Sequence, residues 1–534
     1  MASSDSERTV ARSANHFLTG TFISRFSGMV RDLSMAFCFG TSPAIAAFLI
    51  AFRLSNLLRR LFGEGALLNG FIPFFEGKRK EDPKKGAEFF RDIFWSLTFI
   101  LFSTIVTLEV ILAFVLYFCT LSTGTVQIIN MTMVMLPGLV FICLFGLSMA
   151  LLECEKNFFV PGVAPVAFNV VWISAIWIFR DLAPYHAMMG ISISIVLAFF
   201  FQWWVTLPGV IKYVREFLSI KEWFKINVFS QELKDMVVPL LLGVLGVAAV
   251  QINSAVDVIV ARFASLEGPA YLSYSHRLQQ LPLALFGIAI ASALMPALSR
   301  AIKRDDQEEY RSLLEFGFAR TFSLLFPGMI AIFVLGGASV NLLYGRGEFS
   351  NSSTIHTTYC LWSYGIGLVP TAFVFLLAPA FYARRDFWTP TLASLLTVVI
   401  NLLLSLIMIF VFNFGAMSVA FATSTAAFFN MWFLVKRVHV KVFQSLTELF
   451  LKVAFVSVIS GVVVLCVSMY LFEDPIKAMF LRDIVIVFPR SLFSQVNHFV
   501  VLTTLFATVF FSLSYLLKIQ PVLDLVLPKG RAEK

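Results

Sequence analysis

The sequence predicts an all-α, polytopic membrane protein. Of its 534 residues, 59% are hydrophobic and only 14% are charged. Apolar runs of helical length recur from one end of the chain to the other, and the loops between them are alternately rich and poor in Lys and Arg. A water-soluble domain could not bury so much apolar surface, so this class is excluded.

Fourteen apolar runs are long enough to cross about 30 Å of hydrocarbon as helices that rise 1.5 Å per residue. The second run exceeds that thickness and is expected to project into the cytosol. In chain order the predicted spans are 22–40, 46–75, 89–118, 128–152, 158–179, 185–209, 233–264, 270–299, 312–337, 353–382, 390–413, 416–435, 448–472 and 496–517.

The connecting loops predict the orientation. Strongly basic loops follow spans two, six, eight, ten and twelve, whereas the loops after spans one, three and eleven contain no Lys or Arg. The positive-inside rule therefore places both termini in the cytosol. Loop 473–495, on the predicted outer side, is an exception because it mixes basic and acidic residues. The net charge of +9 is explained mostly by this topology, and no nucleic-acid partner is needed.

An internal repeat indicates two halves. Its anchors are an Asp, an X-Arg-Leu triplet and a Pro, found at Asp32, Phe52–Leu54 and Pro73 and again at Asp257, His276–Leu278 and Pro296. Six spans per repeat give both halves the same orientation, as in parallel-repeat transporters with a central substrate site. The predicted parts are a cytosolic tail (1–21), an N-lobe (22–209), a cytosolic linker (210–232), a C-lobe (233–437), a final pair of spans (438–518) and a second cytosolic tail (519–534).

Charged side chains lie inside the first, second and eighth spans. An arginine at the centre of a spanning helix costs about 2.5–3.5 kcal/mol on insertion scales, so several of them indicate a polar cavity. Convergent guanidinium groups match phosphate oxygens bidentately and favour a diphosphate over a cationic drug. The predicted binding residues are Arg25, Arg31, Arg59 and Arg277, with Asp32, Arg53 and Glu64 as secondary cavity charges. The alternative is structural ion pairing, Asp32 with Arg31 or Arg25, and Arg60 with Glu64.

A coupling-cation site is predicted in the second half. Asp257, Asn401 and Thr423 could bring oxygen ligands together for a hard cation such as Na⁺. The alternative is a buried Asp that pairs with polar neighbours. Membrane potential is the other candidate energy source, since moving one charge is worth about 2.3 kcal/mol per 100 mV.

Other chemistries lack their motifs. The six histidines are scattered, the six cysteines form no CxxC pair, and no GxxxxGK[ST] loop is present. The sequence therefore predicts no catalytic residues, no metal centre, no required cofactor and no ATP-driven pump.

Several stretches closely resemble the MurJ/MviN lipid II flippases of bacteria, which belong to the multidrug/oligosaccharidyl-lipid/polysaccharide exporter superfamily. They include SRFSGMVRD (Ser24–Asp32), NLLRRLFGEGA (Asn56–Ala66), the segment from Tyr271 to Ser299, LLYGRGEF (Leu342–Phe349) and LAPAFYARRD (Leu377–Asp386). The resemblance covers all fourteen spans. It implies two six-helix lobes, two C-terminal helices that form a lipid-tail groove, and alternating access. The family's cavity arginines correspond to Arg25, Arg31, Arg59 and Arg277.

The chain departs from the family where it has Ala46 and His276, at positions that are often acidic, and where Ser405 follows Asn401 by one helical turn. The expected function is flipping of undecaprenyl-diphosphate-linked disaccharide-pentapeptide across the bacterial inner membrane for peptidoglycan synthesis. Its expected partners are lipid II, membrane lipids and proteins of cell-wall synthesis and division. The alternatives are export of another polyprenyl-linked oligosaccharide or of cationic drugs, and a transport-inactive scaffold for cell-wall proteins.

Overall fold

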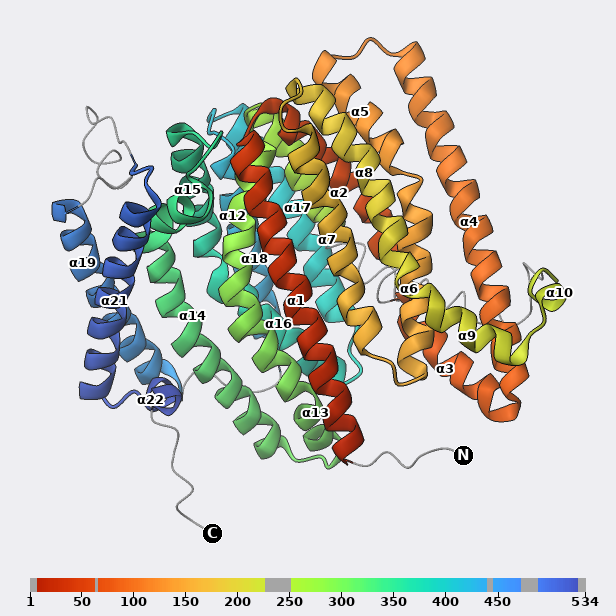
Figure 1. The fold of residues 1–534 in the computed structure, drawn as a ribbon. Coiled ribbons are helices and arrows are strands. Elements are labelled where there is room, and N and C mark those ends of the chain that lie inside the picture. Colours follow the sequence, from red (N-terminus) through yellow and green to blue (C-terminus); the bar gives the residue numbers. More distant parts are fainter. Residues whose placement is uncertain (1–6, 63–65, 226–250, 439–444, 472–487, 527–534) are drawn as a thin grey trace. The chain divides into compact units, whose positions relative to one another are not determined.

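The computed structural model describes residues 7–62, 66–225, 251–438, 445–471 and 488–526, and every regular element among them is helical (Figure 1). Within this described part, nine helices are long and apolar enough to cross a membrane, or up to eleven if each of two bent pairs counts as one span. The predicted all-α membrane fold is therefore confirmed, whereas the count of fourteen spans stays a prediction.

The chain divides into two compact units, residues 1–255 and residues 256–534. Unit 1 contains α1 (Glu7–Phe39), α2 (Pro43–Phe62), α3 (Ala66–Glu81), α4 (Pro83–Phe118), α5 (Thr123–Met135), α6 (Gly138–Cys154), α7 (Phe159–Phe179), α8 (Pro184–Trp204), α9 (Leu207–Phe217) and α10 (Ile220–Trp223). Residues 251–264 are also helical, and the boundary between the units falls within them.

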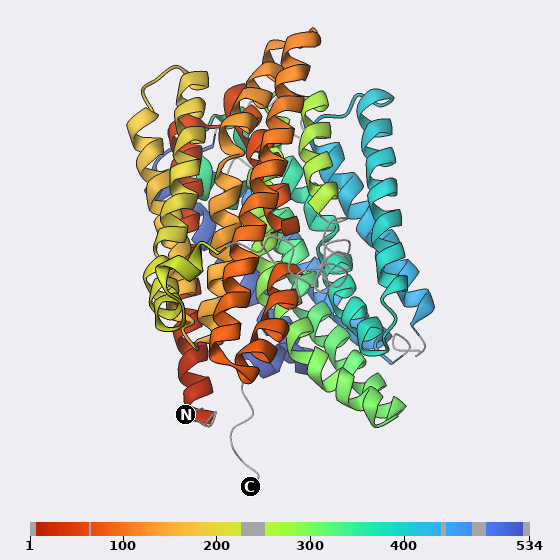
Figure 2. The ribbon, with the colours of Figure 1, turned by 90° about the vertical axis from the view of Figure 1, so that its right-hand side faces the viewer.

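Unit 2 continues with α12 (Gly268–Pro282), the π-helical turn η1 (Leu283–Ile288), α13 (Ala289–Lys303), α14 (Gln307–Tyr344), α15 (Asn351–Ile366), α16 (Leu368–Ala383), α17 (Trp388–Phe410), α18 (Met417–Arg437), α19 (Thr447–Leu471), α21 (Leu492–Leu516) and α22 (Gln520–Val526). Helices α17 and α18 pack along each other, and Figure 2 shows them as a pair in cyan and light blue. Helices α19 and α21 pack together beside α14.

In unit 1, α1 packs along α7, and α7 packs along α8. Aromatic side chains such as Phe48, Phe71 and Phe90 fill the core between the helices of this unit. Helix α4 begins at Pro83, and the carboxylate of Asp82 caps it by accepting a 2.9 Å hydrogen bond from the Lys84 amide. Much of the rest of α4 exposes Phe, Val and Ile side chains, as expected for a helix that faces lipid.

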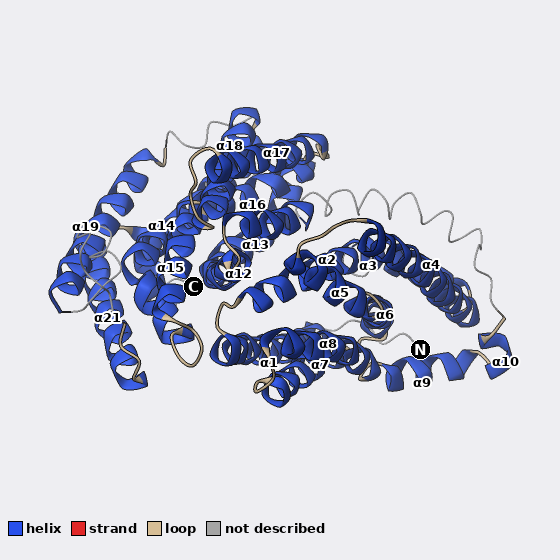
Figure 3. Ribbon diagram, turned by 90° about the horizontal axis from the view of Figure 1, so that it is seen from above, coloured by secondary structure: helices blue, strands red, loops and turns tan. Residues whose placement is uncertain are grey.

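Helices α9 and α10 run across the end of α8 rather than along it, and Figure 3 shows α9 lengthwise in a view along many of the other helices. The α10 segment docks on α4 through three polar contacts. Lys84 Nζ lies 2.6 Å from Glu222 Oε1, Arg91 Nη1 donates to the Glu222 carbonyl at 3.1 Å, and Trp95 Nε1 donates to the Trp223 carbonyl at 3.0 Å. The start of the predicted linker is therefore fixed to unit 1.

Two predicted spans are bent where the backbone is interrupted. The run 128–152 is split into α5 and α6 with a 44° bend, and Pro137 lies between them. The run 353–382 is split into α15 and α16 with a 43° bend at Gly367. A Cβ atom on Gly367 would lie 2.9 Å from the Ser424 Cα atom, so glycine permits this close approach of α18.

Some predictions fall partly outside the described residues. The run 46–75 covers most of α2 and the first part of α3. Residues 63–65 between these helices, which include Glu64, lie outside the described part. Of the seventh run only 251–264 is described, and of loop 473–495 only 488–495. The predicted lobe, linker and tail boundaries stay predictions.

Candidate functional site

Arg31 is buried on α1, with 9% of its surface exposed. Its Nε and Nη2 atoms donate to Oδ1 of Asp32 at 2.9 and 2.6 Å. Its Nη1 atom donates to Oδ1 of Asn169 at 3.0 Å, and its guanidinium carbon lies 4.5 Å from the centre of the Trp172 ring. The structure thus contains the Arg31–Asp32 ion pair that the sequence left open as an alternative.

Asn169 and Trp172 come from α7 and were not predicted as site residues. They lie three positions apart and so share one face of the helix, the face that packs against α1. Both side chains are buried. Asn169 is the one side-chain amide in the apolar segment Phe159–Phe179. This isolated polar residue is the sequence signal that could have predicted a contact between helices at Asn169.

The other arginines of unit 1 are more accessible than Arg31. Arg25, six residues before Arg31 on α1, is exposed, and Arg53 and Arg59 on α2 are half-buried. Arg25 is therefore accessible to a ligand, whereas Arg31 is held in place by its neighbours.

Arg277 lies on α12 in unit 2 and is exposed. It lies five residues before Pro282, after which the helix continues as the π-helical turn η1. Such turns commonly accompany functional sites in helices. The neighbouring His276 ring lies 2.8 Å from Nε2 of Gln280 and 5.3 Å from the ring of Tyr364, so this face of α12 is polar and aromatic.

The predicted oxygen ligands lie close together inside unit 2. Asn401 Nδ2 donates to Oδ1 of Asp257 at 2.5 Å. Thr423 Oγ1 lies 3.2 Å from Oδ2 of Asp257 and 3.3 Å from Oδ1 of Asn401. Asp257 and Asn401 are buried, and Thr423 is half-buried. Residues from three separate helices therefore place a carboxylate, an amide and a hydroxyl oxygen within one small volume.

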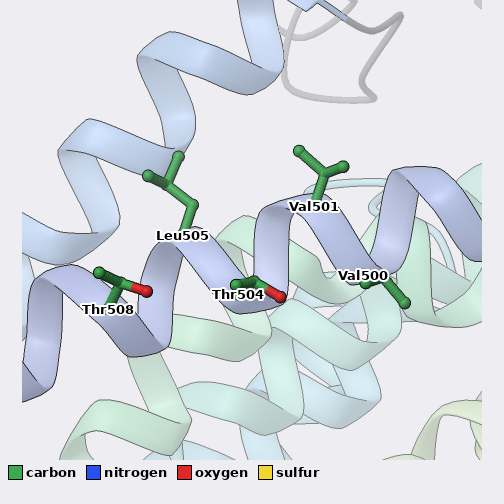
Figure 4. Close-up of a pocket in the computed structure, with 5 residues that line it drawn as sticks. All are labelled: Val500, Val501, Thr504, Leu505 and Thr508. Carbon is green, nitrogen blue, oxygen red and sulfur yellow. The ribbon is translucent and has the colours of Figure 1, made fainter.

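A shallow groove of about 430 Å³ follows one side of α21 (Figure 4). Its walls are almost entirely apolar, and the hydroxyl groups of two threonines add the polar atoms. The lining residues are Val500, Val501, Thr504, Leu505 and Thr508. A groove of this composition suits an acyl or isoprenoid chain better than a charged headgroup.

Comparisons with known proteins identify one family. The family model described as lipid II flippase MurJ matches residues 35–485. A probable lipid II flippase MurJ of Chlamydia pneumoniae is 33% identical over 436 residues, which cover 81% of this chain and 78% of that protein. A probable lipid II flippase MurJ of Vibrio cholerae is 31% identical over 443 residues, which cover 80% and 82% of the two chains.

Solved structures show the same fold. A lipid II flippase MurJ in the inward closed conformation superposes with a TM-score of 0.75 at 21% identity, covering 94% of this chain and 98% of that one. An inward-facing MATE family transporter of the MOP superfamily superposes with a TM-score of 0.62 at 14% identity, covering 78% of this chain and 96% of that one.

Proposed function

The chain belongs to the MurJ family of lipid II flippases, and from this membership we propose that it moves lipid II from the cytoplasmic to the outer leaflet of the bacterial inner membrane. Members of this family are transporters rather than enzymes. The proposed mechanism is alternating access, in which twelve of the fourteen predicted spans form two six-helix lobes that expose the headgroup first to the cytosol and then to the outside. Both termini then lie in the cytosol.

The observation that supports the proposal most is that arginines occur within predicted spans of each unit, on α1 and α2 in unit 1 and on α12 in unit 2. Exposed guanidinium groups at Arg25 and Arg277 can each present two N–H donors to a diphosphate, and half-buried Arg59 adds a third cation. Arg31 contributes a fixed positive group whose charge is partly balanced by Asp32. We assign the diphosphate to these four arginines, with Arg53 and Glu64 as secondary charges.

The oxygen cluster of unit 2 is the proposed Na⁺ site. The Thr423 hydroxyl has one proton but three oxygen neighbours, because Val419 O lies at 2.9 Å in addition to the oxygens of Asp257 and Asn401. One proton cannot satisfy all three, so at least some of these oxygens face each other with lone pairs. A bound cation would relieve that repulsion, and a hard monovalent cation suits a site with one carboxylate. Membrane potential stays the alternative energy source.

The groove on α21 is the proposed contact for the undecaprenyl tail. Its apolar lining lets the tail stay in a lipid-like environment while the headgroup crosses.

Flipping can be tested directly in proteoliposomes. The purified native chain is expected to expose lipid II on the opposite leaflet, as measured by its accessibility to a headgroup-specific antibiotic or enzyme added outside. Vesicles loaded with a polyprenyl diphosphate that carries a different oligosaccharide test the alternative exporter. Exposure of that lipid without exposure of lipid II would contradict the proposal, and exposure of neither would favour the scaffold.

A further inference from the structure

We propose that Asn169 is a positioning residue for Arg31, which it holds in a fixed orientation together with Trp172. The inference rests on the proposed function, because the orientation matters only if Arg31 meets an anionic substrate. It adds α7 to the helices that shape the predicted diphosphate site.

The amide of Asn169 can lie in only one orientation. Its Nδ2 atom donates to the Ser27 hydroxyl at 2.8 Å and lies 3.2 Å from the Ser24 carbonyl oxygen. The Ser27 hydroxyl already donates its proton to the same carbonyl at 2.8 Å, so it accepts from the amide. Because a carbonyl oxygen can only accept, the NH₂ end of Asn169 must face Ser24. Its oxygen therefore faces Arg31.

Three neighbours then define the plane of the Arg31 guanidinium group. Asn169 binds one terminal nitrogen, Asp32 binds the other terminal nitrogen and Nε, and the Trp172 ring lies against the carbon that joins them. Trp172 is itself fixed by edge contacts with Phe48, Phe52 and Phe168, at ring distances of 5.7, 4.9 and 5.5 Å. The guanidinium group is thus restrained on its edge and on one face.

This restraint has a consequence for binding. A free arginine side chain loses rotamer freedom when it binds an anion, whereas a pre-organised one has already lost it on folding. Asn169 also has no charge, so it fixes Arg31 without cancelling its positive charge as a second carboxylate would. A neutral hydrogen-bond acceptor at position 169 is therefore the feature that the inference requires.

The test uses the full-length chain in lipid nanodiscs, with lipid II as the probe, and measures both the Kd and the thermal unfolding temperature. Asn169→Asp keeps an acceptor for Arg31 but adds a second carboxylate. It also replaces the Nδ2 donor to Ser27 with an oxygen, which the Ser27 hydroxyl can meet by turning its proton toward it. We expect this variant to raise the Kd for lipid II about tenfold or more. The increase in Kd is expected to become smaller at high salt, because salt screens the added charge. The double variant Asn169→Asp with Asp32→Asn again has one carboxylate and one amide, and is expected to recover a Kd within about threefold of the native value.

Asn130→Ala is the matched control, because Asn130 makes a contact between helices in the same unit, to the Tyr185 hydroxyl at 3.4 Å, without contacting Arg31. Its Kd is expected to equal that of the native chain. Asn169→Ser supplies a second variant if Asn169→Asp fails to insert, since serine is too short to reach Arg31. Positioning predicts a weaker Kd for this variant at a nearly native unfolding temperature.

The outcomes separate the two proposals. If the native chain binds lipid II and Asn169→Asp binds it equally well, or if the double variant stays as weak as the single one, the positioning role is wrong and the flippase proposal stands. If the native chain does not bind lipid II, the proposed function fails, and the assignment of Asn169 to a diphosphate site fails with it.

Discussion

The Nη2 atom of Arg31 lies 2.6 Å from Oδ1 of Asp32, its neighbour in the chain. Both side chains are largely buried on α1, so this ion pair is shielded from water. The pair places a positive group inside a predicted membrane span at a smaller electrostatic cost than an isolated arginine would incur. It also leaves Arg31 sensitive to any change in its acidic partner.

Replacing Asp32 tests that sensitivity. Asp32→Ala is expected to lower the rate of lipid II flipping in proteoliposomes about tenfold or more, because a hydrogen bond to a charged group contributes about 1.5–3 kcal/mol. Asp92→Ala is the matched control, since Arg91 and Asp92 form the same adjacent pair on α4 at 2.7 Å. If both variants are expressed at the native level and their flipping rates fall equally, the effect of Asp32→Ala is a general one on unit 1 rather than a role in the site.

Removing the Thr423 hydroxyl tests the proposed Na⁺ site. Thr423→Val is expected to weaken the dependence of flipping on a Na⁺ gradient several-fold while lipid II binding is retained, because the variant loses one of three clustered oxygens. Flipping is measured with Na⁺ or K⁺ as the only alkali cation.

Thr425→Val is the control for that variant. Thr425 lies on the same helix, is half-buried like Thr423, and makes the same type of bond to the carbonyl four residues earlier, at 2.9 Å. Native flipping that does not depend on Na⁺ at all would contradict the site and leave membrane potential as the energy source.

Filling the α21 groove tests the tail contact. Leu505→Trp puts a bulky ring among the lining residues and is expected to reduce flipping of lipid II about five- to tenfold, with little effect on an analogue that has a short isoprenoid chain. Val110→Trp, on the exposed apolar face of α4, serves as the control because Val110 does not line the groove. If Leu505→Trp reduces the flipping of long-chain and short-chain substrates equally, the groove does not contact the tail.

The contact between α10 and α4 predicts a pH dependence. Hydrogen bonds from Lys84 and then from Ser219 lower the pKa of Glu222 to about 2. A carboxylate with a lowered pKa stabilises the folded contact above its ordinary pKa, near 4.5, and loses that effect as the pH falls toward about 2. Hydrogen exchange of 219–225, corrected for intrinsic rates, is therefore expected to be constant between about pH 7 and pH 5 and to rise below about pH 4.

Glu222→Gln provides the comparison for that experiment. It removes the charge and is expected to raise exchange several-fold at neutral pH, although the bonds from Arg91 and Trp95 to backbone carbonyls are retained. Native protection that fell between pH 7 and pH 5 would contradict the assignment to Glu222.

Hydropathy alone predicted the membrane fold, because a helix must satisfy its own backbone hydrogen bonds in lipid and the chain has long apolar runs to do so. It could not predict the bend at Gly367. That bend depends on the close approach of Ser424, and Ser424 Oγ donates to the Ser363 carbonyl at 2.6 Å. Contacts between residues about sixty positions apart leave no periodic signal in the sequence.

The site was predictable to a similar extent. The carboxylate, amide and hydroxyl at Asp257, Asn401 and Thr423 were predicted to form one cluster, and the structure brings them together. That the arginines of the apolar spans line a common cavity stays a prediction. The sequence did not show whether Arg31 is exposed or restrained. Its restraint comes from Asn169 and Trp172, which reach it only because α7 packs along α1.

Arg277 provides the most direct test of the central claim that a cavity of arginines binds the diphosphate of lipid II. The native chain, Arg277→Lys and Arg277→Ala would be expressed in a bacterium depleted of its own lipid II flippase, and growth and outer-leaflet lipid II would be measured. Arg304→Ala, at an exposed arginine just after α13, controls for loss of surface charge. We expect rescue by the native chain and by Arg304→Ala, partial rescue by Arg277→Lys because an ammonium cannot bind bidentately, and no rescue by correctly inserted Arg277→Ala. Full rescue by Arg277→Ala would contradict the claim.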